Sequence, residues 1–216
     1  MAELLVIRHG QASFGADNYD QLSALGEKQS VAVGDALRDM NWVPDRMVTG
    51  TLERQKKTLE FMGFSGAADE HPGWNEYDFY DLLRVRHGGE MPHDVRHDRR
   101  THFRTLRETV FDWQAGGLEG TKESWSDFTD RIESARKFST AEGAERVLVV
   151  SSGGVIGQLA AQSVEAPPKM MMTLNLQVKN TSITKFIFSG SRFFLHEFNS
   201  TPHFATPERA GLMSYS

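Results

Sequence analysis

The apolar residues of this chain follow two alternating patterns, one typical of buried strands and one typical of amphipathic helices. Continuous apolar runs at 4–8 and 147–150 have the length and composition of strands buried on both faces, and 46–50 predicts a further short strand. Between these runs, apolar positions three and four residues apart predict helices. The predicted helices cover about 24–40, 51–62, 103–113, 125–138 and 156–164.

Residues that start and stop secondary structure refine these limits. Ser23 is placed to cap the first helix, and Gly63 to end the second. Residues 63–95, rich in Gly, Pro, His and Asp, predict irregular structure. TSITKFIF and RFFLHEF predict a β-hairpin, and the residues from about Thr201 look like a tail. The predicted inward positions of the first helix are Ala32, Val33, Ala36, Leu37 and Met40.

The alternation of strands and helices, closed by a hairpin, predicts the fold class. We expect an α/β fold, a three-layer α/β/α sandwich with a central, mostly parallel mixed sheet. No repeat or linker divides the chain, so residues 1–216 are expected to form one domain. Ligands bind such sheets beyond the carboxyl ends of the strands. Functional residues are therefore expected in the loops after Ile7, Val48 and Val150.

Composition excludes several classes of protein. With 39% apolar and 25% charged residues, the 216-residue chain is expected to be globular. It contains no cysteine, which excludes a disulfide framework and fits a reducing compartment. MAELLVIRHG lacks the basic and long apolar regions of a signal peptide, so none is expected, and no apolar run is long enough to span a membrane. We therefore expect a cytoplasmic protein without a membrane partner, and the net charge of −5 argues against a nucleic-acid partner.

One segment has the opposite charge. Residues 84–107 contain seven Arg and four His against three acidic residues. A basic segment in an acidic protein can attract an anionic ligand, although a solvated helix face with local ion pairs is the alternative. His93 and His97 are spaced to share a metal on a helix, but no third ligand has suitable spacing. No metal and no other cofactor is predicted.

Two loops carry residues suited to phosphate chemistry. Arg8, His9 and Gly10 follow the first strand. A guanidinium grips phosphate, a neutral imidazole can attack phosphorus, and glycine lets the backbone approach a ligand. The stretch VLVVSSGGVIGQL at 147–159 runs from a strand through small residues into a helix, and helix N-termini bind anions.

On these residues the sequence resembles the phosphoglycerate mutase-like histidine phosphatases. LLVIRHGQAS, LSALGEKQSVAVGDAL, TGTLERQKKTLEF, GWNEYDFYDL, VLVVSSGGVI and NTSIT are similar to that family's motifs, in the same order, from residue 4 to about 185. The resemblance implies the family's α/β sandwich and a phosphoryl-transfer reaction. It also implies that residues 63–122 form an insertion that covers the substrate.

The resemblance assigns roles to individual residues. His9 would be the nucleophile and would carry a transient phosphohistidine, while Arg8 and Arg54 would clamp the phosphoryl oxygens. Glu76 would protonate the leaving oxygen and then activate water; Asp78 or Glu70 would hold this role if the alignment shifts. The other substrate-binding positions that the resemblance implies are Gly10, Gln11, Ser152 and Gly153.

Position 152 departs from the family pattern. Ser152 stands where the family has a second histidine that donates to the phosphoryl group. Ser152 and the Gly153 amide could still bind phosphate with slower turnover, since losing one preorganised donor costs about 10²–10³ in rate. Alternatively another histidine takes its place, or the chain binds a phosphorylated ligand without turnover. The candidate histidines are His71, His87, His93, His97, His102 and His203.

Two smaller departures indicate a reshaped pocket. Gln55 stands where the family favours alanine, and Tyr80 replaces its usual glycine after the acid. We predict a metal-independent phosphohydrolase that acts on a small-molecule or other phosphomonoester. The alternatives are a catalytically weak or silent phospho-ligand binder and a mutase-type phosphotransferase. A homodimer is compatible with the sequence.

Overall fold

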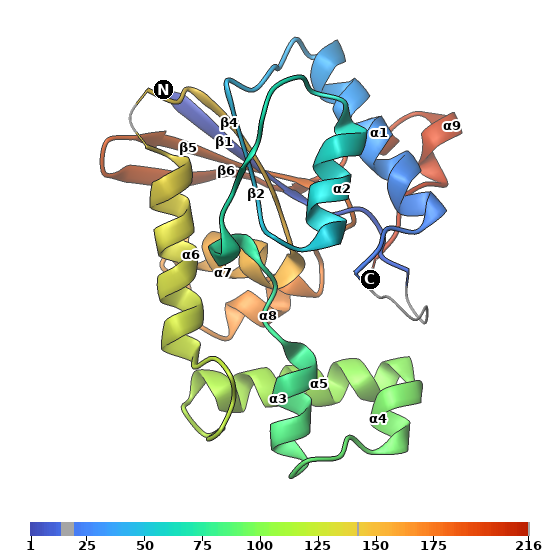
Figure 1. Ribbon diagram of the computed structural model, residues 1–216, viewed down its shortest axis with the longest axis vertical. Coiled ribbons are helices and arrows are strands. Elements are labelled where there is room, and N and C mark those ends of the chain that lie inside the picture. Colours follow the sequence, from blue (N-terminus) through green and yellow to red (C-terminus); the bar gives the residue numbers. More distant parts are fainter. Residues whose placement is uncertain (14–19, 142, 216) are drawn as a thin grey trace.

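The computed structural model describes residues 1–13, 20–141 and 143–215, without the side chains of Arg96, His97 and Arg99 (Figure 1). The expected α/β fold is confirmed. A six-stranded mixed sheet has the strand order β3-β2-β4-β1-β5-β6. Its strands are β1 (Ala2–Arg8), β2 (Arg46–Thr49), β3 (Asp69–Glu70), β4 (Arg146–Ser151), β5 (Ile183–Ser189) and β6 (Arg192–Ser200).

Helices cover both faces of this sheet, and a further group lies apart from it, at the foot of Figure 1. The helices near the sheet are α1 (Ala24–Asp39), α2 (Glu53–Met62), α6 (Trp125–Ser139), α7 (Gly153–Ser163), α8 (Met170–Asn175) and α9 (Pro207–Ala210). The separate group contains α3 (Phe79–Arg86), α4 (His93–His97) and α5 (Arg99–Gln114). Short 3₁₀ turns are η1 (Pro72–Trp74) and η2 (Pro202–Phe204). Within the described residues, no helix is long and apolar enough to cross a membrane.

Strand β1 shows why its apolar run is continuous. Leu4 and Val6 belong to the core on the α6 and α7 side, whereas Leu5 and Ile7 pack against α1 and α2 on the other side. Successive side chains of a strand point to opposite faces, so a strand covered on both faces needs apolar residues at every position.

Parallel pairing brings three strand ends together, as predicted. Arg8 at the end of β1 pairs with Ser151 of β4, and Thr49 of β2 pairs with Val150. The loops that follow β1, β2 and β4 therefore start at one edge of the sheet. The hairpin of β5 and β6 is also confirmed, with β5 antiparallel to β1.

The prediction of irregular structure over residues 63–95 is wrong. This segment contains β3, η1, α3 and the start of α4. Asp78 caps α3 by accepting a hydrogen bond from the Asp81 amide at 3.0 Å, and Leu82 and Leu83 are buried. Helix α3 is only eight residues long, so its apolar period is too short to stand out among flanking Gly, Pro and Asp.

The apolar residues that end two of the predicted helices, Met40 and Val164, are exposed. Met40 is 52% exposed and Val164 is 55% exposed. Each is the C-cap residue of its helix, α1 or α7, and lies where the chain leaves the helical path. The helical periodicity therefore ends one residue before each of these positions, and both side chains face solvent.

The expectation of a tail from Thr201 is also wrong. His203 and Phe204 are buried, and the chain then continues through α9 and packs against α1. Gln29 of α1 donates to the Leu212 carbonyl at 2.6 Å and to Ser214 Oγ at 2.8 Å. The last residues are therefore part of the packed structure.

His203 makes this packing sensitive to acid. Burial lowers the pKa of His203 to about 3, and its Nε2 lies 3.0 Å from Thr181 Oγ1. Because an unfolded histidine titrates near 6.5, the unfolded chain binds more protons as the pH falls below 6.5. At pH 5 this costs roughly 2 kcal/mol of unfolding free energy. Between pH 7 and pH 5, we expect the unfolding free energy of His203→Gln to fall by about 2 kcal/mol less than that of the wild type.

Urea denaturation at both pH values measures this difference. His196→Gln is the matched control, because His196 is exposed on β6. A loss of stability in His203→Gln equal to that of the wild type would contradict the assignment.

Candidate functional site

His9 is a buried imidazole whose two ring nitrogens have different partners. Its Nδ1 lies 2.8 Å from the Gly10 carbonyl oxygen, and Arg54 Nε donates to its Nε2 at 3.1 Å. A carbonyl only accepts, so Nδ1 carries the proton. Nε2 is then the nitrogen with the available electron pair, and it faces the guanidinium of Arg54.

Arg54 comes from the first turn of α2. Its Nη1 forms an ion pair with Asp20 Oδ1 at 2.6 Å, and Asp20 Oδ2 accepts the Glu53 amide at 2.8 Å. One carboxylate therefore anchors the helix start and orients the guanidinium. Arg54 is only 6% exposed, so its charge is held in the site rather than in solvent.

Arg8 supplies a second buried guanidinium. Its Nη1 donates to the Val178 carbonyl, and a Cβ placed on Gly153 would lie 3.6 Å from Arg8 Cζ. The N-terminus of α7 therefore lies against Arg8. Two cations and the positive end of a helix dipole form a place where negative charge is stabilised.

Glu76 reaches the same helix N-terminus from the loop before α3. Its Oε2 accepts the Gly154 amide at 3.0 Å, and its Oε1 accepts the Tyr77 amide at 3.2 Å. A Cβ on Gly154 would lie 2.3 Å from Glu76 Oε1, so glycine is required for this approach. The structure thus brings Glu76, Arg8, Arg54 and His9 to one edge of the sheet.

Burial sets the protonation of both titratable groups. It lowers the pKa of His9 well below its ordinary value, and the charges of Arg54 and Arg8 lower that pKa further. Burial raises the pKa of Glu76, and this effect exceeds the opposing effects of the Gly154 amide and the two arginines. Burial therefore favours the neutral form of both the imidazole and the carboxyl group.

Gly10 and Gln11 face α1. A Cβ on Gly10 would lie 2.5 Å from the Gly26 carbonyl oxygen, so this glycine allows loop and helix to touch. The Gln11 amide donates to Gln29 Oε1 at 2.9 Å, and Gln11 Oε1 accepts from Ser23 Oγ at 3.0 Å. These contacts of Gln11 join the loop to α1, and its role in substrate binding stays a prediction.

Ser152 is the N-cap residue of α7 and has no exposed surface. Its Oγ accepts a hydrogen bond from Gln55 Nε2 at 2.8 Å. Two of the three positions that depart from the family pattern, Gln55 and Ser152, are therefore in direct contact. Gly153 follows Ser152 beside Arg8, and a Cβ there would lie 2.5 Å from Asn175 Oδ1.

The alternative acidic residues make other contacts. Asp78 caps α3 and binds Lys122 Nζ at 2.8 Å, whereas exposed Glu70 lies 3.6 Å from Lys56 Nζ. Both carboxylates face solvent, whereas Glu76 is at the N-terminus of α7 beside Gly154, and the acid role of Glu76 stays a prediction.

Several candidate histidines also have partners elsewhere. His71 accepts the Gly73 amide, His102 Nδ1 lies 3.0 Å from the Val95 carbonyl, and His203 contacts Thr181. His97 has its side chain outside the described residues. The described contacts place none of these three rings against Ser152.

Sequence reasoning missed three residues that brace the site. Asp20 orients Arg54, Thr58 Oγ1 accepts the Gly10 amide at 2.9 Å, and Asn180 Nδ2 donates to the His9 carbonyl at 3.3 Å. Asn180 opens the NTSIT motif, which was a usable signal. Asp20 and Thr58 had none, because their roles depend on contacts far apart in the sequence.

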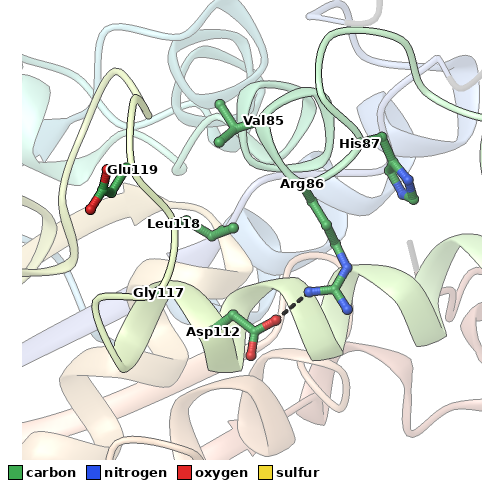
Figure 2. Close-up of a pocket in the computed structure, with 7 residues that line it drawn as sticks. All are labelled: Val85, Arg86, His87, Asp112, Gly117, Leu118 and Glu119. Atoms are coloured by element: carbon green, nitrogen blue, oxygen red, sulfur yellow. Dashed lines mark hydrogen bonds and ion pairs between the residues drawn. The ribbon is translucent and has the colours of Figure 1, made fainter.

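Two surface pockets lie in the helical segment between β3 and α6. One, of about 560 Å³, is lined by residues of α3, α5 and the following loop, and Arg86 is ion-paired with Asp112 there (Figure 2). The other, of about 720 Å³, is lined by Tyr80, Arg84 and residues 89–93. His9, Arg54 and Glu76 line neither pocket. We therefore assign neither of these two pockets a role in phosphate binding.

Comparison with known proteins identifies the family and the fold of this chain. Residues 4–201 match the model of the histidine phosphatase superfamily (branch 1). No curated protein gives a significant sequence match. Among solved structures, a phosphoserine phosphatase from Entamoeba histolytica is 20% identical, with a TM-score of 0.67 over 94% of this chain and 99% of that one.

Two further structures share the fold. The alpha-ribazole phosphatase from Shigella flexneri is 19% identical, with a TM-score of 0.65 over 92% of this chain and 96% of that one. A phosphoglycerate mutase from Bacillus anthracis is 18% identical, with a TM-score of 0.65 over 94% of each chain. The family match covers most of the chain, and the chain therefore belongs to branch 1 of the histidine phosphatase superfamily.

Proposed function

We propose that this protein hydrolyses phosphomonoesters through a phosphohistidine intermediate on His9. The observation that carries the proposal is the contact of Arg54 Nε with His9 Nε2 at 3.1 Å, with Nδ1 bonded to the Gly10 carbonyl. It orients a neutral nucleophilic nitrogen toward a guanidinium that can hold a phosphoryl oxygen. Family membership and the phosphatases among its structural relatives support the same reaction class.

The first half of the reaction forms the phosphoenzyme. The electron pair of His9 Nε2 attacks phosphorus, and the bond from phosphorus to the leaving oxygen breaks. The Glu76 carboxyl group gives its proton to that oxygen, so the leaving group departs as a neutral alcohol. Arg8 and Arg54 stabilise the charge on the phosphoryl oxygens, which makes the proposal independent of a metal.

The second half regenerates the enzyme. The Glu76 carboxylate takes a proton from water, and the water oxygen attacks phosphorus as the bond from phosphorus to His9 Nε2 breaks. Inorganic phosphate leaves, and both side chains return to their starting protonation.

The helical segment from α3 to α5 fits the proposed role of a substrate cover. Glu76 leads directly into α3, and Tyr77 packs against Trp113 of α5 and Phe128 of α6, with ring centroids 5.7 Å apart in both pairs. A leaving group that receives its proton from Glu76 therefore departs toward this segment. We propose that residues 63–122 set the choice of substrate.

Rapid-quench labelling tests the proposed intermediate. With a ³²P-labelled aryl phosphate and a chelator present, we expect protein label that survives alkali, is lost in acid and maps to the peptide containing His9. His196→Gln, on exposed β6, should label like the wild type. Absence of both label and phosphate release would contradict the enzymatic proposal and favour a silent phospho-ligand binder.

A further inference from the structure

Gln55 is a buried amide whose contacts the proposed reaction does not explain. It follows Arg54 on α2, has no exposed surface and reaches Ser152 at the N-terminus of α7. A buried amide must place two donors and one acceptor among its neighbours. The neighbours of Gln55 therefore determine which of its atoms faces which group.

The orientation of this amide is fixed by a backbone carbonyl. Gln55 Nε2 lies 2.9 Å from the Trp74 carbonyl oxygen and 2.8 Å from Ser152 Oγ. A carbonyl oxygen only accepts, so the atom facing Trp74 must be the NH₂ group. Its second N–H then donates to Ser152 Oγ. Ser152 is the acceptor in this contact, and its own hydroxyl proton is not used there.

The other end of the amide shows that this orientation has a cost. Gln55 Oε1 is buried and has no hydrogen-bond partner among the described residues. It lies so close to the backbone that a Cβ on Gly50 would be 2.0 Å from it. A buried acceptor without a partner is rare in proteins. The two hydrogen bonds that Gln55 Nε2 donates offset the cost of leaving Oε1 without a partner.

Ser152 lies among the groups that would hold the phosphoryl oxygens. The preceding residue, Ser151, pairs with Arg8, and its carbonyl accepts the His9 amide at 2.9 Å. The next two residues face Arg8 and Glu76. The hydroxyl of Ser152 is therefore at the same end of the sheet as the nucleophile.

We propose that Gln55 is a positioning residue that, by donating to Ser152 Oγ, leaves the Ser152 hydroxyl proton as a neutral hydrogen-bond donor to the phosphoryl group. The inference rests on the proposed function, since it specifies a donor in that reaction. It also couples two positions: a larger side chain at 152 would need the space that the Gln55 amide now occupies.

A double-mutant cycle tests the positioning role. Gln55→Met keeps most of the volume but removes the donor, and Ser152→Ala removes the proposed donor to phosphate. We expect each single variant to lower kcat by about 10²-fold with little change in KM, and the double variant to be no worse than either. The matched control is Gln158→Met, because Gln158 is also a buried glutamine but is on α7. This variant should keep wild-type kcat.

Binding of orthovanadate, measured by calorimetry, gives a readout that needs no turnover. Gln55→Met and Ser152→Ala should both weaken it, while Gln158→Met should not. Wild-type kcat and vanadate affinity in Gln55→Met would overturn the inference and leave the proposed function standing. Absence of wild-type turnover would instead contradict the proposed function. The vanadate affinities of the variants would still decide the role of Gln55.

The shared space gives an independent test. We expect Ser152→His alone to lower the melting temperature without raising kcat, because the imidazole meets the Gln55 amide. Combining it with Gln55→Ala should restore stability and raise kcat above that of Ser152→His by about 10-fold or more. Equal kcat in Ser152→His with and without Gln55→Ala would contradict the coupling of the two positions.

Discussion

Replacing His9 with alanine is expected to lower hydrolysis of an aryl phosphate by about 10⁴-fold or more. The variant removes the ring nitrogen to which Arg54 Nε donates, so the proposed phosphohistidine cannot form. Arg8 and Arg54 remain, and substrate binding should change far less than kcat. Steady-state kinetics from pH 4 to pH 8 measure the loss.

The matched variant His9→Gln separates chemistry from packing. Its Oε1 can accept the hydrogen bond from Arg54 Nε, yet the amide is not a nucleophile. We expect it to be as inactive as His9→Ala but closer to the wild type in thermal stability. Residual activity in His9→Ala above that of a mock purification would show that another group is the nucleophile.

Replacing Glu76 with glutamine is expected to give the second largest loss, and the loss should depend on the leaving group. A general acid contributes about 10²–10⁴-fold, most where the leaving oxygen is strongly basic. We therefore expect a loss of about 10³-fold with an alkyl phosphate and a loss at least ten times smaller with a nitrophenyl phosphate. Comparing kcat/KM for the two substrates measures this difference.

The pH profile gives the second signature of Glu76. Burial raises the pKa of this carboxyl group, and the proposed reaction requires its acid form. Wild-type kcat/KM should thus fall as the pH rises through that raised pKa, and Glu76→Gln should lack this fall. Glu70→Gln and Asp78→Asn are controls at the other acidic positions and should keep the wild-type profile. A Glu76→Gln variant with equal losses on both substrates would contradict the proton-transfer role.

Local pattern predicted the parts of the fold in which each residue's environment follows from its neighbours in sequence. The apolar run of β1 indicated burial on both faces, and the two cores beside it confirm this. Ser23 indicated the start of α1, and its side chain does accept the Gly26 amide there. The eight-residue helix α3 was missed, since two turns give too little periodicity to detect.

The C-terminal segment shows a different limit. Its polar, proline-containing sequence looked like a tail, yet His203 is buried and Ser214 accepts from Gln29. Neither feature has a local sequence signal. Ser214 contacts Gln29 of α1, and His203 contacts Thr181 in the loop before β5.

The sequence by itself determined the class of fold, the strand ends at which the site forms, and the residues suited to phosphoryl transfer: His9, Arg8, Arg54 and Glu76. The fold class, the strand ends and the suitability of Arg8 and His9 follow from local periodicity and side-chain chemistry, whereas the roles of Arg54 and Glu76 come from the resemblance to the family's motifs. Only the tertiary structure decided which nitrogen of His9 is protonated and that Gln55 donates to Ser152. Those features depend on groups brought together from distant parts of the chain, since hydrogen-bond direction is set by the partner a buried group meets in space.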